Sequence, residues 1–182
     1  MIFAVYYTKL SPAAISRIEK LFPLIKEATH ERYPLPAEQG IAICFQSIKL
    51  CHPTARCVVL TDLETPISLP GSIEVIRYDV DPNEPSYMRM RARIRFLESL
   101  DRPMSVAFCD YDMIFQKSIE NLFAQSFDLG LTCRKKYMGD RHPAPINEGL
   151  LLVHPEGIAQ VVKFLKILHD YFTNRRAESP FV

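Results

Sequence analysis

Residues 105–112 read Ser-Val-Ala-Phe-Cys-Asp-Tyr-Asp, an apolar run that ends in two aspartates. Val106 to Cys109 form an uninterrupted apolar run, which is typical of a strand buried on both faces. Two carboxylates, Asp110 and Asp112, follow at once. At the end of a buried strand, two neighbouring negative charges are costly unless a cation neutralises them. Oxygen ligands of this kind suit Mg²⁺ or Mn²⁺, so the stretch predicts a divalent metal site.

The sequence on both sides of this strand alternates between strand and helix patterns. Further strands are expected at 2–8, 56–62, 73–79, 127–133 and 146–153. Helices are expected to begin at Ser11-Pro12 and to cover 37–50, 86–100 and 155–172. This alternation predicts an α/β fold, a three-layer sandwich around a mostly parallel sheet. Ligand sites of such sheets gather at the carboxyl ends of the strands.

Length and composition narrow the function classes. A chain of 182 residues predicts a single domain, and 22 Lys and Arg against 21 Asp and Glu argue against a nucleic-acid partner. No apolar run approaches the roughly 18 residues of a transmembrane helix, so none is expected. The five cysteines are odd in number and form no CxxC pair, and the N-terminus reads as a strand rather than a signal peptide. A cytoplasmic location is therefore expected.

Four stretches, taken in order, resemble the GT-A family of nucleotide-sugar transferases. Each corresponds to a helix, a strand or a motif of that family. They are CFQSIKLCHPTARCVVLTD (44–62), YMRMRARIRFLESL (87–100), VAFCDYDMIFQKSIENLF (106–123), and FDLGLTCRKKYMGDRHPAPINEGLLLV (127–153). The third contains the DxD motif of the family, and the fourth ends in its Asn-x-Gly strand. The resemblance implies a glycosyltransferase that moves a sugar from a nucleoside-diphosphate sugar to an acceptor hydroxyl.

The resemblance also implies roles for the acidic pair and for the helix ahead of it. Asp112 would coordinate Mn²⁺ or Mg²⁺ directly, and Asp110 would bind the metal or hydroxyl groups of the donor. An arginine of the preceding helix would contact the donor, and the choice lies between Arg89 and Arg93. A guanidinium forks well onto phosphate or carboxylate oxygens. Arg91 and Arg95 are expected in solvent, because four alternate positions of a helix cannot all face one cleft.

The remaining expected site residues come from the ends of other strands. The nucleotide base would be framed by Tyr6, Tyr7, Thr8 and Asp62, although Asp62 could equally be a turn residue. Tyr111 and Asn147 would contact the donor, and Gly149 would allow a ligand close to the backbone. Glu148 is a candidate general base for the acceptor hydroxyl, or else the partner of Arg134 or Lys135. The sequence does not select the base, and UDP is the default because it is the commonest in the family.

One element of the family pattern is missing from the sequence. Many members carry a third metal ligand, often a histidine, well after the Asn-x-Gly strand, whereas this sequence ends at Val182. Two alternatives remain open: a compact variant, or a fragment without the acceptor segment. None of the five histidines has the spacing of a zinc site.

Two rival functions remain open beside the transferase. One is a phosphatase of the haloacid dehalogenase type, in which Asp110 would be a nucleophile and Asp112 an acid/base. Its second-motif Ser or Thr and its lysine motif are hard to place here. The other is a catalytically silent module that binds a sugar nucleotide or a glycan. The missing third ligand favours this module, whereas retention of both aspartates argues against it.

Overall fold

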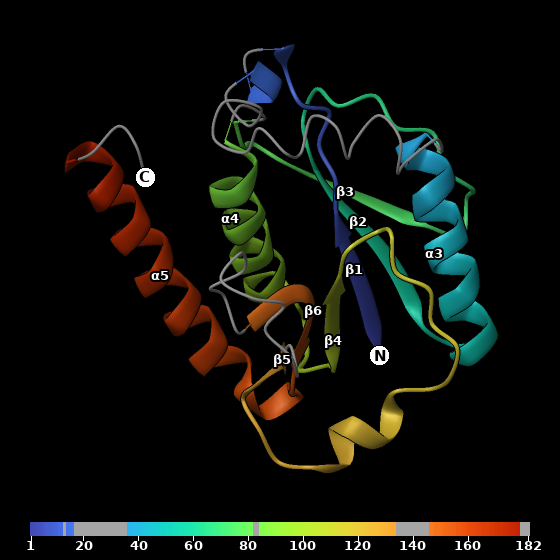
Figure 1. The fold of residues 1–182 in the computed structure, drawn as a ribbon. Coiled ribbons are helices and arrows are strands. Elements are labelled where there is room, and N and C mark those ends of the chain that lie inside the picture. Colours follow the sequence, from blue (N-terminus) through green and yellow to red (C-terminus); the bar gives the residue numbers. More distant parts are fainter. Residues whose placement is uncertain (13, 17–35, 82–83, 134–145, 179–182) are drawn as a thin grey trace, which may run out of the picture.

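The computed structural model describes residues 1–12, 14–16, 36–81, 84–133 and 146–178 (Figure 1). Its centre is a six-stranded sheet with the order β3-β2-β1-β4-β6-β5. The strands are β1 (Ile2–Tyr6), β2 (Arg56–Asp62), β3 (Glu74–Tyr78), β4 (Val106–Cys109), β5 (Leu129–Cys133) and β6 (Ile146–Val153). β1 to β4 run parallel to one another, whereas β6 runs antiparallel to both β4 and β5. This confirms the α/β fold with a mostly parallel sheet.

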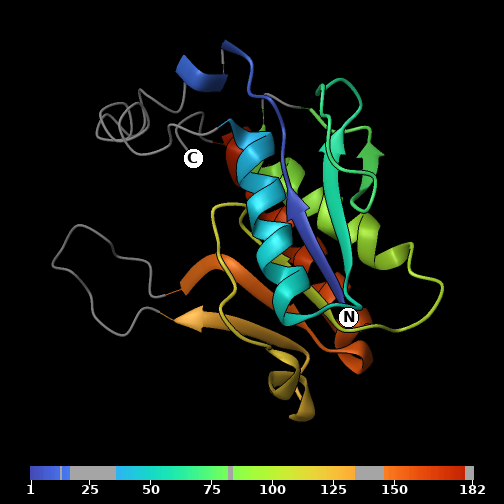
Figure 2. The ribbon, with the colours of Figure 1, turned by 90° about the vertical axis from the view of Figure 1, so that its right-hand side faces the viewer.

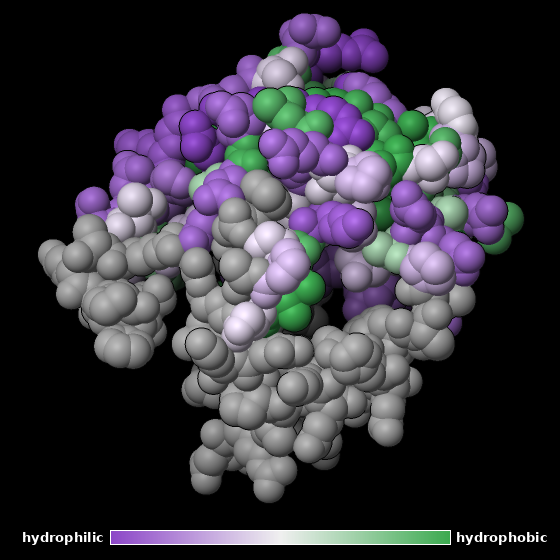
Figure 3. Space-filling model, turned by 90° about the horizontal axis from the view of Figure 1, so that it is seen from above, coloured by the Kyte–Doolittle hydropathy of each residue, from purple (hydrophilic) through white to green (hydrophobic). Residues whose placement is uncertain are grey.

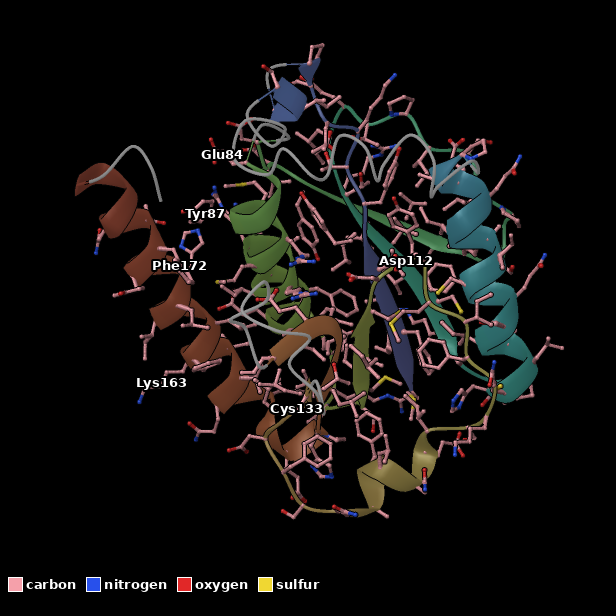
Figure 4. The ribbon with its side chains drawn as sticks, in the orientation of Figure 1. Glu84, Tyr87, Asp112, Cys133, Lys163 and Phe172 are labelled. Carbon is pink, nitrogen blue, oxygen red and sulfur yellow. The ribbon has the colours of Figure 1, made fainter. Side chains whose placement is uncertain are left out.

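Helices cover both faces of the sheet. The helices are α3 (Ala37–Cys51), α4 (Pro85–Glu98) and α5 (Ile158–Glu178). Figures 1 and 2 show α3 on one face of the sheet, and α4 and α5 on the other. At the far end of α5, Phe172 packs edge-on against Tyr87 of α4, with ring centroids 6.3 Å apart (Figure 4). The three-layer arrangement therefore matches the sequence prediction.

The alternation of side chains along the strands divides the core in two. In β1 and β4, Ile2, Ala4, Val106 and Phe108 pack toward α4 and α5. Their neighbours Phe3, Val5, Ala107 and Cys109 pack instead toward α3. The strands are buried on both faces, which explains why their sequences are continuous apolar runs rather than alternating ones.

The boundaries of most elements agree closely with the sequence prediction. β2 and β6 have the expected bounds, and α3 ends one residue beyond its expected limit, where the N–H of His52 donates to the carbonyl of Ile48. Ser11 caps a helix start as expected, because its hydroxyl accepts from the N–H of Ala14 at 3.1 Å. The rest of that expected helix lies outside the described residues.

Three details differ from the prediction. β1 ends at Tyr6 rather than at residue 8, because Thr8 turns into a hydrogen-bonded loop described below. The last helix is preceded by a 3₁₀ turn, η3 (Pro155–Gly157), and continues to Glu178. A second 3₁₀ turn, η1 (Glu120–Ala124), contains the Leu122-Phe123 pair that resembles a helix of the family. No helix in the described part of the chain is both long and apolar enough to cross a bilayer.

Candidate functional site

The predicted site residues lie at the end of the sheet where the four parallel strands stop. Because β6 is antiparallel to β4, its beginning rather than its end reaches this edge. The N–H of Asp110 donates to the carbonyl of Gly149 at 2.9 Å, which joins the DxD motif to the Asn-x-Gly segment. Figure 3 looks down on this end, where hydrophilic and hydrophobic side chains mix among the described residues. The topology thus brings together motifs that lie far apart in the sequence.

Arg89 of α4 connects two carboxylates at this edge. Its Nη2 donates to Glu148 Oε2 at 2.8 Å, and its Nη1 lies 3.5 Å from Asp110 Oδ1. Burial raises the pKa of Asp110 above its ordinary value; attraction to Arg89 lowers it, and repulsion from Asp112 raises it further. The ionised form of Asp110 is therefore less favoured than that of an exposed carboxylate, although Arg89 and Arg93 lie nearby.

Glu148 reaches Arg89 because β6 is irregular at this point. Leu131 and Thr132 are neighbours in β5, but they pair with Leu151 and Asn147 of β6. Glu148, Gly149 and Leu150 therefore bulge out of this ladder, and a bulge re-aims a side chain. Glu148 is bound to an arginine of α4, while its expected alternative partners, Arg134 and Lys135, lie outside the described residues.

Arg93 lies one helical turn beyond Arg89 and is only 5% exposed. Its guanidinium carbon stands 5.3 Å from the ring centroid of Phe108, and its Nη1 lies 4.0 Å from Glu148 Oε2. The Nε has no hydrogen-bond partner among the described residues. Burial, together with repulsion from Arg89, lowers the pKa of Arg93 to about 10. Arg93 is therefore a buried cation whose hydrogen-bond donors are only partly paired among the described residues.

The other two arginines of α4 lie away from this cluster. Arg91 is exposed, and Arg95 is half-buried with its Nη1 3.3 Å from the carbonyl of Asp79. Arg91 has the solvent exposure expected of it, whereas Arg95 is half-buried and not free in solvent.

Asp112 and Tyr111 lie beyond the end of β4, in the segment that turns toward α3. Asp112 is exposed, and Figure 4 shows it past the strand end. The Tyr111 ring is edge-on to Tyr7, with centroids 6.0 Å apart, and a Cβ on Gly40 would come within 3.1 Å of it. Tyr111 therefore packs on the α3 side, opposite to Arg89. Gly40 was not predicted from sequence, whereas Tyr7 lies in the strand end expected to frame the nucleotide base.

Asp62 holds a loop together rather than opening toward solvent. Its Oδ1 accepts from the N–H groups of Glu64 and Thr65 at 2.8 and 2.7 Å. Its Oδ2 accepts from Thr8 Oγ1 at 2.5 Å and from the hydroxyl of Thr65. Burial raises the pKa of Asp62, but these hydrogen bonds outweigh it, so that the net pKa is lowered. Asp62 makes the contacts of a turn residue, which is one of the two roles expected for it.

Thr8 and Tyr6 lie beside this loop, and two further residues complete it. Thr65 also accepts from the N–H of Lys9 at 2.8 Å, and Arg77 donates to the carbonyls of Asp62 and Thr65 at 2.9 Å each. Burial raises the pKa of the Tyr6 hydroxyl, which has no partner that meets hydrogen-bond geometry among the described residues. Neither Thr65 nor Arg77 was predicted, although the Asp-x-x-Thr spacing is a turn signal that could have indicated Thr65.

Ser47 of α3 anchors the segment that follows Asp112. Its Oγ donates to the carbonyl of Cys44 at 2.7 Å and accepts from the N–H of Phe115 at 3.0 Å, and both bonds are buried. Phe115 in turn packs edge-on against Phe3 at 5.2 Å. The segment that carries Asp112 is thus tied to the core.

We expect Ser47→Ala to lower the free energy of unfolding by about 1–2 kcal/mol, because it leaves the buried N–H of Phe115 unpaired. Urea unfolding measures the change. The exposed neighbour Gln46 provides the control, since Gln46→Ala is expected to change stability by less than about 0.5 kcal/mol. Equal stability of Ser47→Ala and wild type would contradict the anchoring role.

The last two predicted contacts come from the start of β6. Asn147 pairs with Thr132 of β5 through the backbone. The structure does not describe the side chain of Asn147. Gly149 is buried and contacts Asp110 as described above. Among the residues described, no group of three or more His, Cys, Asp or Glu side chains is arranged as a metal site.

Two hollows lie elsewhere on the molecule. One of about 440 Å³ is lined by residues 117–122, and one of about 450 Å³ lies between α3 and the segments around Cys57 and Ile73. Neither is lined by a predicted site residue. The strand-end cluster therefore remains the candidate site on the chemistry of its side chains.

No model of a known protein family matches the sequence, and no curated protein matches it. The structure of the chain does match solved structures. The chain is similar to the galactosyltransferase LgtC in complex with donor and acceptor sugar analogs, with a TM-score of 0.51 and 15% identity. It is also similar to the glycosyltransferase GlyE of Streptococcus pneumoniae, with a TM-score of 0.51 and 10% identity. The chain has the fold of these glycosyltransferases.

The likeness extends over nearly the whole of this chain but not of those proteins. It covers 93% of this chain and 65% of LgtC, and 98% of this chain and 38% of GlyE. The GT-A-like fold expected from the sequence is therefore confirmed over the shared part.

Proposed function

We propose that this chain is a metal-dependent glycosyltransferase that moves a sugar from a nucleoside-diphosphate sugar to an acceptor hydroxyl. The observation that carries the proposal is the pair Asp110 and Asp112 at the carboxyl end of β4, beside the arginines of α4. In open α/β sheets this edge is where ligands bind. The similarity of fold to glycosyltransferases supports the same reaction class.

The surroundings of the acidic pair suit a divalent cation. The pKa of Asp110 is raised first by burial, with Asp112 and Glu148 adding repulsion, so additional positive charge would stabilise its ionised form. Asp110 and Asp112 would hold Mn²⁺ or Mg²⁺, which usually keeps water and substrate phosphates in its shell. When bound, such an ion neutralises the diphosphate and stabilises the leaving group.

The remaining side chains would bind and orient the two substrates. Arg89 offers a guanidinium fork for phosphate oxygens, and Arg93 holds a buried positive charge behind it. Glu148 would accept the proton of the acceptor hydroxyl if it acts as a general base. Because Arg89 and Arg93 surround Glu148, that role requires Arg89 to leave the carboxylate first. UDP is the first nucleoside diphosphate to test.

The test is thermal unfolding with nucleoside diphosphates, with and without Mn²⁺, for wild type and Asp112→Ala. Ligand at a hundredfold excess over its Kd stabilises a protein by about 2.7 kcal/mol, so we expect a rise in Tm of about 5 °C or more. The rise should require Mn²⁺ and vanish in Asp112→Ala. Asp101→Ala removes an exposed aspartate outside the site and should retain the full rise.

Other outcomes favour the rival functions. If no nucleoside diphosphate raises the Tm of wild type, the transferase proposal fails. Metal-dependent hydrolysis of a simple phosphate ester would favour the phosphatase. Nucleotide binding without sugar transfer or donor hydrolysis would favour the silent binding module.

A further inference from the structure

The two contacts of Arg89 are unequal in length. Its bond to Glu148 is 2.8 Å, within the range of a strong charge-assisted hydrogen bond. Its approach to Asp110 is 3.5 Å, at the outer limit of hydrogen bonding. The guanidinium therefore neutralises Asp110 from a distance, without a strong bond to it.

Arg89 and Arg93 also differ in their freedom to move. The Arg89 side chain is 29% exposed and lies between carboxylates that are 43% and 60% exposed. The Arg93 side chain is 6% exposed, and the ring of Phe108 lies against its guanidinium. Arg89 therefore has more room to change its rotamer than Arg93, whose burial keeps it near Glu148. Glu148 thus keeps a cation beside it when Arg89 moves.

We propose that Arg89 is an exchangeable counter-ion of the DxD motif. In the ligand-free chain, Arg89 supplies positive charge to Asp110. During binding, Arg89 releases Asp110 to the divalent cation and turns to an oxygen of the donor diphosphate. This inference rests on the proposed function, because it requires both a metal and a diphosphate at this site.

The exchange predicts how the two ligands influence each other. Without a nucleotide, Arg89 and the divalent cation compete for Asp110, so that the metal alone binds weakly. A diphosphate gives Arg89 another anionic partner and ends the competition. The metal and the nucleotide therefore each raise the affinity for the other, as thermodynamic linkage requires.

The experiment measures Mn²⁺ affinity by electron paramagnetic resonance, with and without UDP, for wild type and three variants of α4. For Mn²⁺ alone, we expect Arg89→Gln to bind about two- to fivefold more tightly than wild type, the range for loss of one partly exposed ion pair. UDP should raise the Mn²⁺ affinity of wild type about tenfold, but that of Arg89→Gln less than about threefold.

Two variants serve as controls. Arg91→Gln removes an exposed arginine of the same helix and should behave as wild type in both titrations. Arg89→Lys keeps the positive charge and should bind Mn²⁺ alone with an affinity close to that of wild type. If Arg89→Lys instead matches Arg89→Gln, charge competition is not the cause and the proposal is overturned.

The proposal and the proposed function fail in different ways. Arg89 is not a counter-ion if Arg89→Gln binds Mn²⁺ alone no more tightly than wild type, or if it keeps the full effect of UDP. Wild type that binds Mn²⁺ but no nucleoside diphosphate would overturn the proposed function itself. Circular dichroism and Tm values confirm that each variant is folded before titration.

Discussion

Replacing Asp62 with alanine is expected to lower the free energy of unfolding by about 3–4 kcal/mol, measured by urea denaturation at neutral pH. The side chain is buried and accepts four hydrogen bonds, two from backbone N–H groups and two from the hydroxyls of Thr8 and Thr65. Alanine leaves these donors without an acceptor, and the cost of each is that of an unsatisfied buried group. A loss below about 1 kcal/mol would contradict the structural role of Asp62.

Asp62→Asn is the matched control for charge. The amide keeps one acceptor for the N–H groups, and the two threonine hydroxyls can rotate to accept from its NH₂ group. We therefore expect Asp62→Asn to lower the free energy of unfolding by roughly half as much as Asp62→Ala.

The pH dependence follows from the lowered pKa of Asp62. Its stabilisation is fully present above the ordinary carboxyl pKa of about 4 and is lost as pH falls through the lower folded-state value. The difference between wild type and Asp62→Ala should thus shrink below about pH 4.

Replacing Arg93 with methionine is expected to raise the free energy of unfolding by about 1–3 kcal/mol while weakening nucleotide binding. Burial is the main cause that lowers the pKa of Arg93 to about 10, so the folded state disfavours the charged side chain. Each unit of such a shift corresponds to about 1.4 kcal/mol. Loss of the contact between the guanidinium and Phe108 offsets part of the gain. Methionine fills a similar, largely apolar space.

Two measurements on Arg93→Met separate stability from function. Urea denaturation should show the gain, and the Mn²⁺-dependent rise in Tm with UDP should fall, with affinity reduced about tenfold. Arg91→Met is the control and should change neither quantity, because Arg91 is exposed. A destabilised Arg93→Met, or a stabilised one with full nucleotide binding, would show that Arg93 is an ordinary packing residue.

The elements of the fold were predictable because burial leaves a strong pattern in the sequence. β2 and β6 are apolar runs bounded by polar residues, and the structure has them at their expected limits. The direction of β6 was not predictable, because an apolar run has the same composition whether the strand is parallel or antiparallel.

The site was predictable in its residue types but not in its contacts. The acidic pair follows a buried strand, so its position at the sheet edge could be derived from the sequence. The bond between Arg89 and Glu148 joins residues 59 positions apart and depends on the bulge of β6. Asp62 remained ambiguous because its partner Thr8 lies 54 positions away. Contacts between distant residues need the topology, which a single sequence does not contain.

The alternation of side chains in β4 limits which insertions and deletions this strand can accept. Phe108 packs toward α4 and Cys109 toward α3, and the next two residues continue this pattern with Asp110 near Arg89 and Tyr111 on Gly40. Deleting one codon within 106–109 would place the following side chains on the opposite faces. The tyrosine would then face the arginines, and Asp110 would face the helix that lacks them. A change of length within β4 should therefore separate Asp110 from Arg89.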